Sequence, residues 1–167
     1  MIFPEVKIFV NEPFVDERGE LYTVFNKQDF DFDLDFNHDK VSTSKKNVLR
    51  GLHGDTKSWK LITCLKGEIY LVIVDYRKES KNYLKWDSIK LSSSNKISIL
   101  VPPMFANGHL VLSEYAVFFY KWSYTGLYPD VNDQFSINWK DTRVKIDWPI
   151  DYPILSDRDK NSKFIDE

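Results

Sequence analysis

The sequence predicts an all-β protein built as a sandwich or barrel of antiparallel strands. Along most of the chain, apolar residues alternate with polar ones or gather in short runs rich in β-branched side chains. Turn-forming residues separate these runs at intervals of about eight to twelve residues, as in antiparallel sandwiches and barrels. Only the tail beyond Trp139 has much helical potential. We therefore expect short helices only near the C-terminus.

The first half of the chain contains six candidate strands. The turn-like segment Asp16–Gly19 precedes the second of them, and Lys66-Gly67 separates the last two as a hairpin. Between the second and third, Asp29–Phe36 alternates Asp with Phe or Leu. Because Asp is a poor strand former, we expect an irregular surface segment that pins its apolar side chains down. The six strands are Ile8–Val10, Glu20–Phe25, Lys40–Ser44, Asn47–Leu49, Lys60–Leu65 and Glu68–Asp75.

The second half of the chain contains four more candidate strands. Pro102 and Pro103 end one of them, because proline cannot donate a hydrogen bond to a neighbouring strand. These strands are Leu84–Leu91, Ile97–Val101, His109–Leu112 and Val117–Trp122. No repeat and no composition shift marks a boundary, so 1–167 is predicted to be a single domain. A chain of this length needs no disulfide or metal to support its core.

Composition excludes several classes of protein. With 23 basic and 25 acidic residues, a net charge of -2 and a pI near 5.9, the chain is not expected to bind nucleic acid or an anionic membrane by bulk electrostatics. The longest apolar runs, Ile69–Val74 and Tyr115–Tyr120, are too short to span a bilayer. The single Cys64 excludes an internal disulfide, lies in an apolar strand pattern where it should be inert, and fits a reducing cytoplasm.

Motifs for metals and phosphates are missing from the sequence. The three histidines, His38, His53 and His109, form neither an HxH nor an HExxH pair. There is no glycine-rich phosphate loop and no GxSxG elbow. We therefore expect neither a metal centre nor a cofactor. Aromatic residues are abundant, with 12 Phe, 9 Tyr and 5 Trp, which suits either a well-filled β core or a site that stacks on sugars or bases.

The motif Arg50-Gly51-Leu52-His53 is the clearest candidate for chemistry. Arg50 and His53 flank a glycine at the expected end of a strand. In an extended backbone they would point to opposite faces, because their separation is odd. A bend at Gly51 would bring both into one cavity. Taken by itself, a lone histidine is more often a packing or surface residue than a catalyst.

A set of motifs in one order resembles the nucleotide-sugar 3,5-epimerase family of cupin-type proteins, typified by dTDP-4-dehydrorhamnose 3,5-epimerase. The resemblance covers about residues 14 to 160, nearly the whole chain. It implies a double-stranded β-helix, or jelly roll. The motifs are Asp16-Glu17-Arg18-Gly19, Arg50-Gly51-Leu52-His53, Lys60-Leu61, Gly67, Val74-Asp75-Tyr76-Arg77, Ser80, Leu91, Val101-Pro102, Phe105-Ala106, Trp148-Pro149 and Leu155-Ser156-Asp157-Arg158-Asp159.

The resemblance also implies an assembly and a reaction. Family members work as homodimers, so we expect the N-terminal strands to pair with a second subunit. The implied reaction needs no metal and acts on a nucleoside-diphosphate 4-keto sugar. A ketone at C4 acidifies the hydrogens on C3 and C5, so a base can remove one and an acid can return a proton to the opposite face. Imidazole suits the base at neutral pH.

Family motifs assign roles to particular residues. The implied base is His53, oriented by the carboxylate of Asp159, and the implied acid is Tyr120. Other readings of the residues are structural: Tyr120 lies in an aromatic run typical of a core, Asp159 could cap a short helix, and a strand lysine such as Lys60 usually faces solvent.

Three cations complete the implied site. Lys60 matches the lysine that stabilises the enolate oxygen, and Arg50 matches the arginine that clamps the pyrophosphate. Arg18 matches an arginine of the sugar-nucleotide site that often comes from the partner subunit. The nucleobase of the substrate is expected to stack on an aromatic side chain, with Trp122, Tyr124 and Tyr128 as candidates.

Several positions depart from the family pattern around the hexose pocket. Asn107 stands where a second histidine is usual, and His109 stands where an apolar residue is usual. We include both among the substrate-binding candidates. Leu71 replaces an acidic residue, Thr23 replaces a glutamate, and Gly54-Asp55 follows the Arg50–His53 motif. These changes suggest an unusual sugar or a different set of epimerised carbons, and they resemble a subgroup that acts on GDP-linked 4-keto heptoses in capsule biosynthesis.

The expected function is inversion of C3, or of C3 and C5, of a nucleoside-diphosphate 4-keto sugar in surface polysaccharide biosynthesis. GDP-4-keto-heptose and dTDP-4-keto-6-deoxyhexose are the two candidate substrates. One alternative is a 3,4-ketoisomerase, but that family resemblance would require a paired histidine motif where Gly54-Asp55 stands. Another is a jelly roll that binds sugar nucleotides without catalysis.

Overall fold

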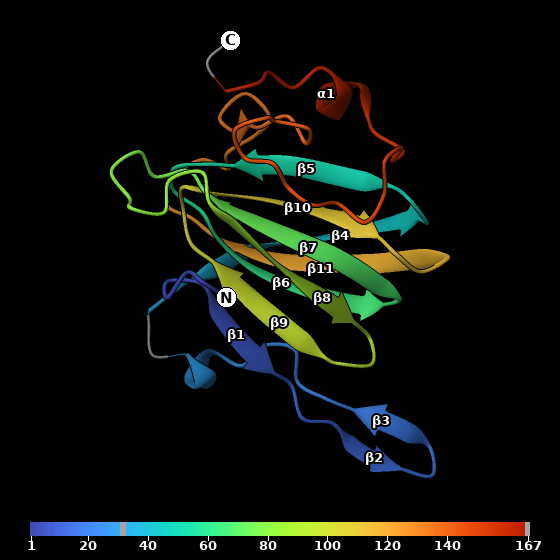
Figure 1. The fold of residues 1–167 in the computed structure, drawn as a ribbon. Helices are drawn as coiled ribbons and strands as arrows, with labels where there is room; N and C mark the ends of the chain where they lie inside the picture. Colours follow the sequence, from blue (N-terminus) through green and yellow to red (C-terminus); the bar gives the residue numbers. More distant parts are fainter. Residues whose placement is uncertain (31–32, 166–167) are drawn as a thin grey trace.

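The computed structural model describes residues 1–30 and 33–165 and contains two facing five-stranded antiparallel sheets (Figure 1). They confirm the predicted sandwich of jelly-roll type. The first sheet has the order β1 (Lys7–Val10), β9 (Ile97–Val101), β6 (Trp59–Lys66), β11 (Tyr115–Ser123) and β4 (Phe36–Lys45). The second has the order β12 (Phe135–Ser136), β5 (Leu49–Gly54), β10 (Phe105–Val111), β7 (Glu68–Asp75) and β8 (Trp86–Ser92).

The main core lies between the two sheets. It contains Ile62 of β6, Leu71 and Ile73 of β7 and Ile99 of β9, all fully buried. Leu71, at a position where the family pattern has an acidic residue, is therefore a core residue. Cys64 is buried in the same cluster, and burial raises the pKa of its thiol to about 11. The thiol consequently stays protonated at neutral pH.

A second core covers the outer face of the second sheet. Val72 and Val74 of β7 pack there against the C-terminal segment, which lies over β5 and β10 in Figure 1. Trp148 belongs to this cluster and donates a hydrogen bond from Nε1 to the Trp139 carbonyl at 3.0 Å. Strand β7 is thus buried on both faces. This explains why the run Ile69–Val74 is apolar without alternation.

The N-terminal hairpin of β2 (Phe14–Asp16) and β3 (Gly19–Leu21) projects away from both large sheets (Figure 1). The strand expected over Glu20–Phe25 was wrong in extent, since β3 ends at Leu21. Its partner β2 starts directly after Pro13, which has no N–H to extend the ladder. Phe14, Val15 and Leu21 are exposed on this hairpin. Pairing with a second subunit stays a prediction.

The expectation that helices occur only near the C-terminus was wrong. A 3₁₀ turn, η1 (Lys27–Asp29), forms early in the chain, because Asn26 caps it by accepting a hydrogen bond from the Gln28 N–H at 3.2 Å. Phe30 and Phe36 of the predicted irregular segment do pack inward, with Phe30 lying 4.6 Å from Phe9 between ring centroids. Residues 31–32 of that segment lie outside the described residues. Helix α1 (Asp157–Lys160) confirms a short helix in the tail.

Two strand boundaries matter for the site. The strand predicted over Lys40–Ser44 is confirmed within the longer β4 (Phe36–Lys45), whereas the piece predicted over Asn47–Leu49 was wrong, since Asn47 lies in a turn with a φ of 66°. Strand β5 begins only at Leu49, so Arg50 and His53 lie within a strand and not at its end. The strands predicted in the second half of the chain differ less from those in the structure, although β10 begins at Phe105 and not at His109.

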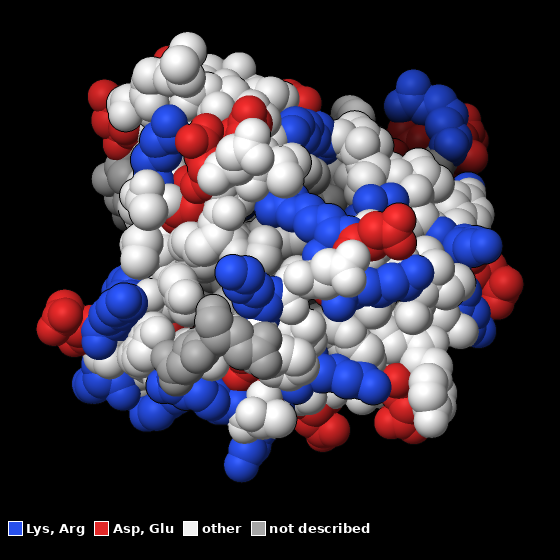
Figure 2. Space-filling view, turned by 90° about the horizontal axis from the view of Figure 1, so that it is seen from above, with Lys and Arg blue, Asp and Glu red and all other residues white. Residues whose placement is uncertain are grey.

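Charge is mixed over the face that carries the C-terminal segment. Viewed from above the orientation of Figure 1, Lys and Arg side chains are interspersed with Asp and Glu (Figure 2). Within residues 1–30 and 33–165, no helix is long and apolar enough to cross a membrane.

Candidate active site

A pocket of about 450 Å³ opens between the two five-stranded sheets. It collects all the predicted catalytic and substrate-binding residues except Arg18 and the stacking candidate Tyr124. Strands of both sheets and the C-terminal loops contribute to its wall. The lining residues are Lys40, Ser42, Arg50, His53, Lys60, Asn107, His109, Phe118, Tyr120, Trp122, Tyr128, Val131, Gln134, Ser156, Arg158 and Asp159.

A bulge in β5 brings Arg50 and His53 into this pocket. Across the pairing with β10, His53 lies opposite Asn107 and Arg50 lies opposite His109, so three steps on β5 match two on β10. The extra residue cancels the odd separation and puts both side chains on one face. Gly51 makes this possible with a φ of +127°, and a Cβ there would lie 2.5 Å from the Gly108 Cα. The predicted bend at Gly51 is confirmed.

His53 and Asp159 form a hydrogen-bonded pair. His53 Nε2 lies 2.7 Å from Asp159 Oδ1, and the Asp159 side chain is only 3% exposed. Burial alone would raise the pKa of this carboxyl, but the hydrogen bond from His53 and a backbone hydrogen bond from Gly51 hold it below its usual value. Asp159 does not cap helix α1, because Ser156 takes that position and accepts from the Asp159 N–H at 3.1 Å.

Tyr120 reaches the pocket from the opposite sheet. It lies on β11, whereas His53 lies on β5. Its ring packs between Phe118 and Trp122, with centroid distances of 5.0 and 5.7 Å. Burial, with a smaller contribution from Tyr128, raises the pKa of Tyr120 to about 12. Tyr120 is therefore both an aromatic packing residue and a neutral hydroxyl bordering the cavity.

Lys60 does not face solvent. Its side chain is 7% exposed and its Nζ forms an ion pair with Asp55 Oδ2 at 3.0 Å. Nζ also lies 4.4 Å from the ring centroid of Trp122. Burial lowers the pKa of Lys60, and Asp55 opposes that change. Asp55 accepts further hydrogen bonds from the backbone of Lys57 and Ser58, which hold it in place.

Further cations surround the pocket. Arg50 donates from Nε to Ser44 Oγ at 2.9 Å, and Arg158 donates to Gln134 Oε1 at 3.2 Å. Lys40 hydrogen-bonds Tyr128 and lies 4.2 Å above its ring. Sequence reasoning missed Lys40 and Arg158 as site residues. The even spacing of Lys40, Ser42 and Ser44 on one strand was a usable signal, because such residues share a face.

Asn107 and His109 lie side by side on the inner face of β10. Asn107 Nδ2 donates to the His53 carbonyl at 3.3 Å and thereby braces the strand that carries the histidine. His109 is 5% exposed and stacks on Phe118 with a centroid distance of 4.1 Å and an interplanar angle of 10°. Its Nε2 has no hydrogen-bond partner.

Arg18 lies outside this pocket within the described chain. It is on the β2–β3 hairpin, is 83% exposed and pairs with Asp16 at 2.5 Å. Among the candidate stacking residues, Trp122 and Tyr128 line the pocket, whereas Tyr124 packs outside it against Tyr128. No group of three potential metal ligands occurs in the described part of the chain.

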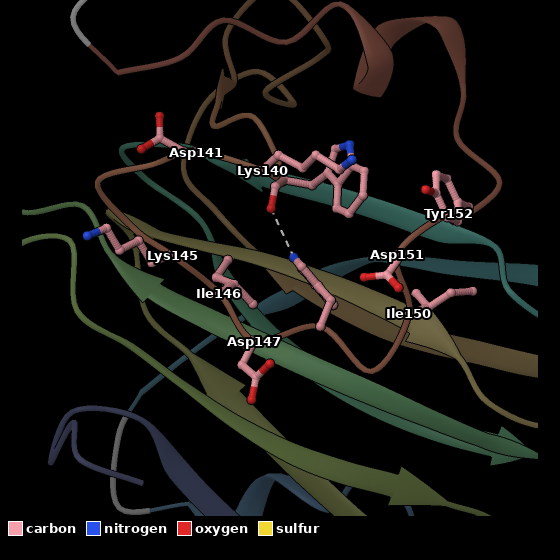
Figure 3. A pocket seen from close by; sticks show the side chains of 10 residues that line it. Lys140, Asp141, Lys145, Ile146, Asp147, Ile150, Asp151 and Tyr152 are labelled. Atoms are coloured by element: carbon pink, nitrogen blue, oxygen red, sulfur yellow. Dashed lines mark hydrogen bonds between the residues drawn. The ribbon is translucent and has the colours of Figure 1, made fainter.

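A second hollow, of about 460 Å³, is lined by residues within 139–152 of the C-terminal segment (Figure 3). It contains none of the predicted site residues. Its most buried carboxylate, Asp141, accepts hydrogen bonds from the backbone N–H groups of Arg143, Val144 and Ile165. This carboxylate therefore stabilises the fold of the loop. The chemistry-bearing groups gather in the pocket between the sheets.

The fold and the pocket define a class: a cupin-type jelly roll whose interior holds a histidine–carboxylate pair, a tyrosine on the facing sheet and several cations. Comparison with known proteins is more specific. The family model of dTDP-4-dehydrorhamnose 3,5-epimerase matches residues 1–167. The chain belongs to the dTDP-4-dehydrorhamnose 3,5-epimerase family and is an isomerase of the epimerase type.

Individual relatives agree over almost their full length. The dTDP-4-dehydrorhamnose 3,5-epimerase of Shigella flexneri is 39% identical over 171 residues, which covers 98% of this chain and 93% of the relative. The enzyme of Methanothermobacter thermautotrophicus is 38% identical over a match that covers 91% of this chain and 85% of the relative. A crystal structure of dTDP-6-deoxy-D-glucose-3,5-epimerase from Legionella pneumophila, in complex with dTDP-4-keto-L-rhamnose, superposes with a TM-score of 0.91 at 34% identity, covering 98% and 89%.

Proposed function

We propose that this chain epimerises a dTDP-linked 4-keto sugar at C3, or at C3 and C5, with His53 as base and Tyr120 as acid. The observation that carries the proposal is the 2.7 Å contact between His53 Nε2 and Asp159 Oδ1, in a pocket that Tyr120 borders from the other sheet. A base and an acid on facing sheets can act on opposite faces of a sugar ring held between them. Inversion of a carbon requires proton removal and return on opposite faces, which this arrangement allows.

The proposed steps conserve atoms and charge. With Nε2–H donating to Asp159, the neutral imidazole of His53 has Nδ1 free to accept a proton. Nδ1 takes the proton from C3, and the C–H electron pair becomes the enolate, with its negative charge on the C4 oxygen. Lys60 stabilises that charge. The Tyr120 hydroxyl then protonates C3 from the opposite face, and the ketone re-forms. His53 releases its proton to solvent and the Tyr120 phenolate takes one up, which restores both groups.

Substrate binding follows from the charges and rings of the pocket. Arg50, Lys40 and Arg158 supply positive charge for a pyrophosphate, and guanidinium groups suit phosphate oxygens. Trp122 and Tyr128 offer ring faces for the nucleobase. Arg18 would complete the site from a second subunit, since its hairpin exposes apolar side chains that a partner could cover.

The nucleotide is proposed to be dTDP, because the relatives at 38–39% identity are named for dTDP-linked substrates. A 3'-monoepimerase from Streptomyces bikiniensis in complex with dTDP-quinovose, at 26% identity and a TM-score of 0.87, supports inversion of C3 alone as a variant of this fold. A GDP-linked 4-keto heptose, suggested by the departures around Asn107 and His109, is the second candidate substrate. Surface polysaccharide biosynthesis is the proposed setting for either sugar.

Deuterium exchange tests the proposal. The purified chain is incubated in deuterated water with dTDP- and GDP-linked 4-keto sugars, and NMR follows label at C3 and C5 together with the configuration of each carbon. We expect label and inversion with the dTDP-linked sugar and loss of both in His53→Asn. Movement of the carbonyl to C3 would instead indicate a ketoisomerase, and binding without any label would indicate a non-catalytic jelly roll.

The homodimer is tested separately by sedimentation. We expect a dimer at micromolar concentration that uses the β2–β3 hairpin. Replacing the exposed Phe14 and Leu21 with Ser should weaken it. A wild-type chain that sediments as a monomer would contradict the proposed role of Arg18 in a shared site.

A further inference from the structure

We propose that His109 hydrogen-bonds a hydroxyl group of the sugar ring through Nε2 and so helps to select the sugar that enters the pocket. The inference rests on the proposed function, because it supposes that a nucleotide sugar occupies this cavity. It assigns a role to a residue that stands where the family pattern has an apolar side chain. The role is in binding and specificity, not in proton transfer.

His109 lies in the wall of the pocket between the two sheets. Strand β10 runs between β5 and β7 in the middle of its sheet, with His109 opposite Arg50 on one side and Leu71 on the other. The imidazole stacks on Phe118, which belongs to the facing sheet. Phe118 in turn contacts Tyr120 on the same strand, at 5.0 Å between centroids. The side chain thus extends the aromatic surface that carries the proposed acid.

The unpartnered nitrogen points to a ligand. Of the described buried side-chain atoms, only four lack a hydrogen-bond partner, and of these only His109 Nε2 and Trp122 Nε1 belong to residues that line this pocket. A buried polar atom without a partner destabilises the protein, whereas an apolar ring would fill the same space at no such cost. A substrate hydroxyl in the cavity would satisfy Nε2.

The charge state of His109 selects the kind of group that it binds. Burial, together with the nearby Arg50 guanidinium and His53, lowers the pKa of His109 to about 3, and Asp159 only partly opposes this. The imidazole is therefore neutral at physiological pH and too weakly basic to replace His53. A neutral imidazole has one donor and one acceptor nitrogen, and a hydroxyl can pair with either. Phosphate oxygens would instead go to Arg50, Lys40 and Arg158.

Two variants separate binding from packing. His109→Phe keeps a stacked ring against Phe118 but removes the nitrogen, and His109→Gln keeps a polar group of similar reach. Isothermal titration with dTDP and with dTDP-glucose, which carries the sugar hydroxyls but no 4-keto group, measures the contribution of the sugar. We expect His109→Phe to weaken the binding of dTDP-glucose about ten-fold, the scale of one lost hydrogen bond, and to leave the binding of dTDP unchanged. His109→Gln should recover part of the loss.

Measurements of stability and kinetics distinguish substrate binding by His109 from a purely structural role. The melting temperature of His109→Phe should equal or exceed that of wild type, because an unpartnered polar atom has been removed. KM for the 4-keto substrate should rise about ten-fold with a smaller change in kcat. Unchanged affinity for dTDP-glucose, equal weakening of dTDP and dTDP-glucose, or a lower melting temperature without loss of affinity would each overturn the inference.

The two proposals fail in different ways. If wild-type protein binds dTDP-glucose but exchanges no deuterium with any 4-keto sugar, the proposed reaction fails, while the binding comparison still tests His109. If wild type epimerises normally and His109→Phe binds dTDP-glucose as wild type does, only the inference about His109 fails. A set of dTDP sugars each lacking one hydroxyl then identifies the partner. Wild type should discriminate against one of them about ten-fold, and His109→Phe should not.

Discussion

His53 Nε2 and Asp159 Oδ1 lie 2.7 Å apart although the two residues are 106 positions apart in the chain. His53 belongs to a strand in the middle of the sequence, and Asp159 belongs to the short helix α1 near its end. The carboxylate is buried and the imidazole borders the pocket. This contact holds the imidazole in one orientation and one tautomer, with Nδ1 as the basic nitrogen.

Replacing Asp159 with Asn should disable His53, the proposed base, without unfolding the protein. The amide no longer stabilises the imidazolium that forms when His53 takes a proton. We expect deuterium exchange at C3 to fall about 100-fold or more. NMR in deuterated water measures the rate. Asp157→Asn is the matched control, because Asp157 is on the same helix but 95% exposed, and it should exchange at the wild-type rate.

Tyr120→Phe should separate exchange from inversion. The variant keeps the ring between Phe118 and Trp122 and loses only the hydroxyl, so His53 can still form the enolate and return the proton to the original face. Deuterium should enter C3 with retained configuration while inversion becomes about 100-fold slower. Tyr115→Phe, at the exposed start of the same strand, should change neither rate. Inversion at the wild-type rate in Tyr120→Phe would exclude this residue as the acid.

The ion pair of Lys60 and Asp55 should show separate structural and chemical roles. Both side chains are almost fully buried, so Lys60→Met leaves an uncompensated carboxylate and should lower the free energy of unfolding by roughly 3 kcal/mol or more. Adding Asp55→Asn removes that charge and should restore much of the stability. Urea unfolding measures both effects. The double variant should remain slow in deuterium exchange, because the enolate still lacks its cation; full recovery of the rate would show that Lys60 only supports the fold.

Acid stability should depend on His109. Its pKa in the folded protein is about 3, against 6.5 as its ordinary value. The unfolded chain therefore binds an extra proton between these values, and the stability that the neutral imidazole retains above pH 6.5 is lost as pH falls toward 3. Between pH 7 and pH 4 we expect His109→Phe to gain about 3 kcal/mol relative to wild type. Urea unfolding at the two pH values checks this, and a constant difference would contradict the buried, neutral state of His109.

The pattern of residues was enough to predict most strands. Apolar runs and turn signals located Lys60–Leu65, Glu68–Asp75 and Ile97–Val101 almost as the structure has them, because nearly every residue of these strands is buried. The β2–β3 hairpin was less predictable. Its extent depends on where Pro13 interrupts pairing and not on the hydrophobicity of Glu20–Phe25.

The sequence predicted which residues form the candidate site better than it predicted the surroundings of those residues. Family resemblance selected His53, Tyr120 and Asp159, and the pocket contains all three. As a lysine on a strand, Lys60 was expected to face solvent, whereas the structure buries it against Asp55 and Trp122. Lys40 and Arg158 reach the pocket from distant parts of the chain, and local patterns do not record such proximity.

By itself, the sequence determined the all-β class, the balanced charge and the set of residues able to carry acid–base chemistry, because these depend on side-chain type and local spacing. Only the tertiary structure decided which of them meet. The β5 bulge at Gly51 turned Arg50 and His53 to one side, and the packing of α1 brought Asp159 to His53. Burial then made His109 neutral and kept Tyr120 protonated. Such shifts come from the loss of water around a group, which depends on every segment packed against it.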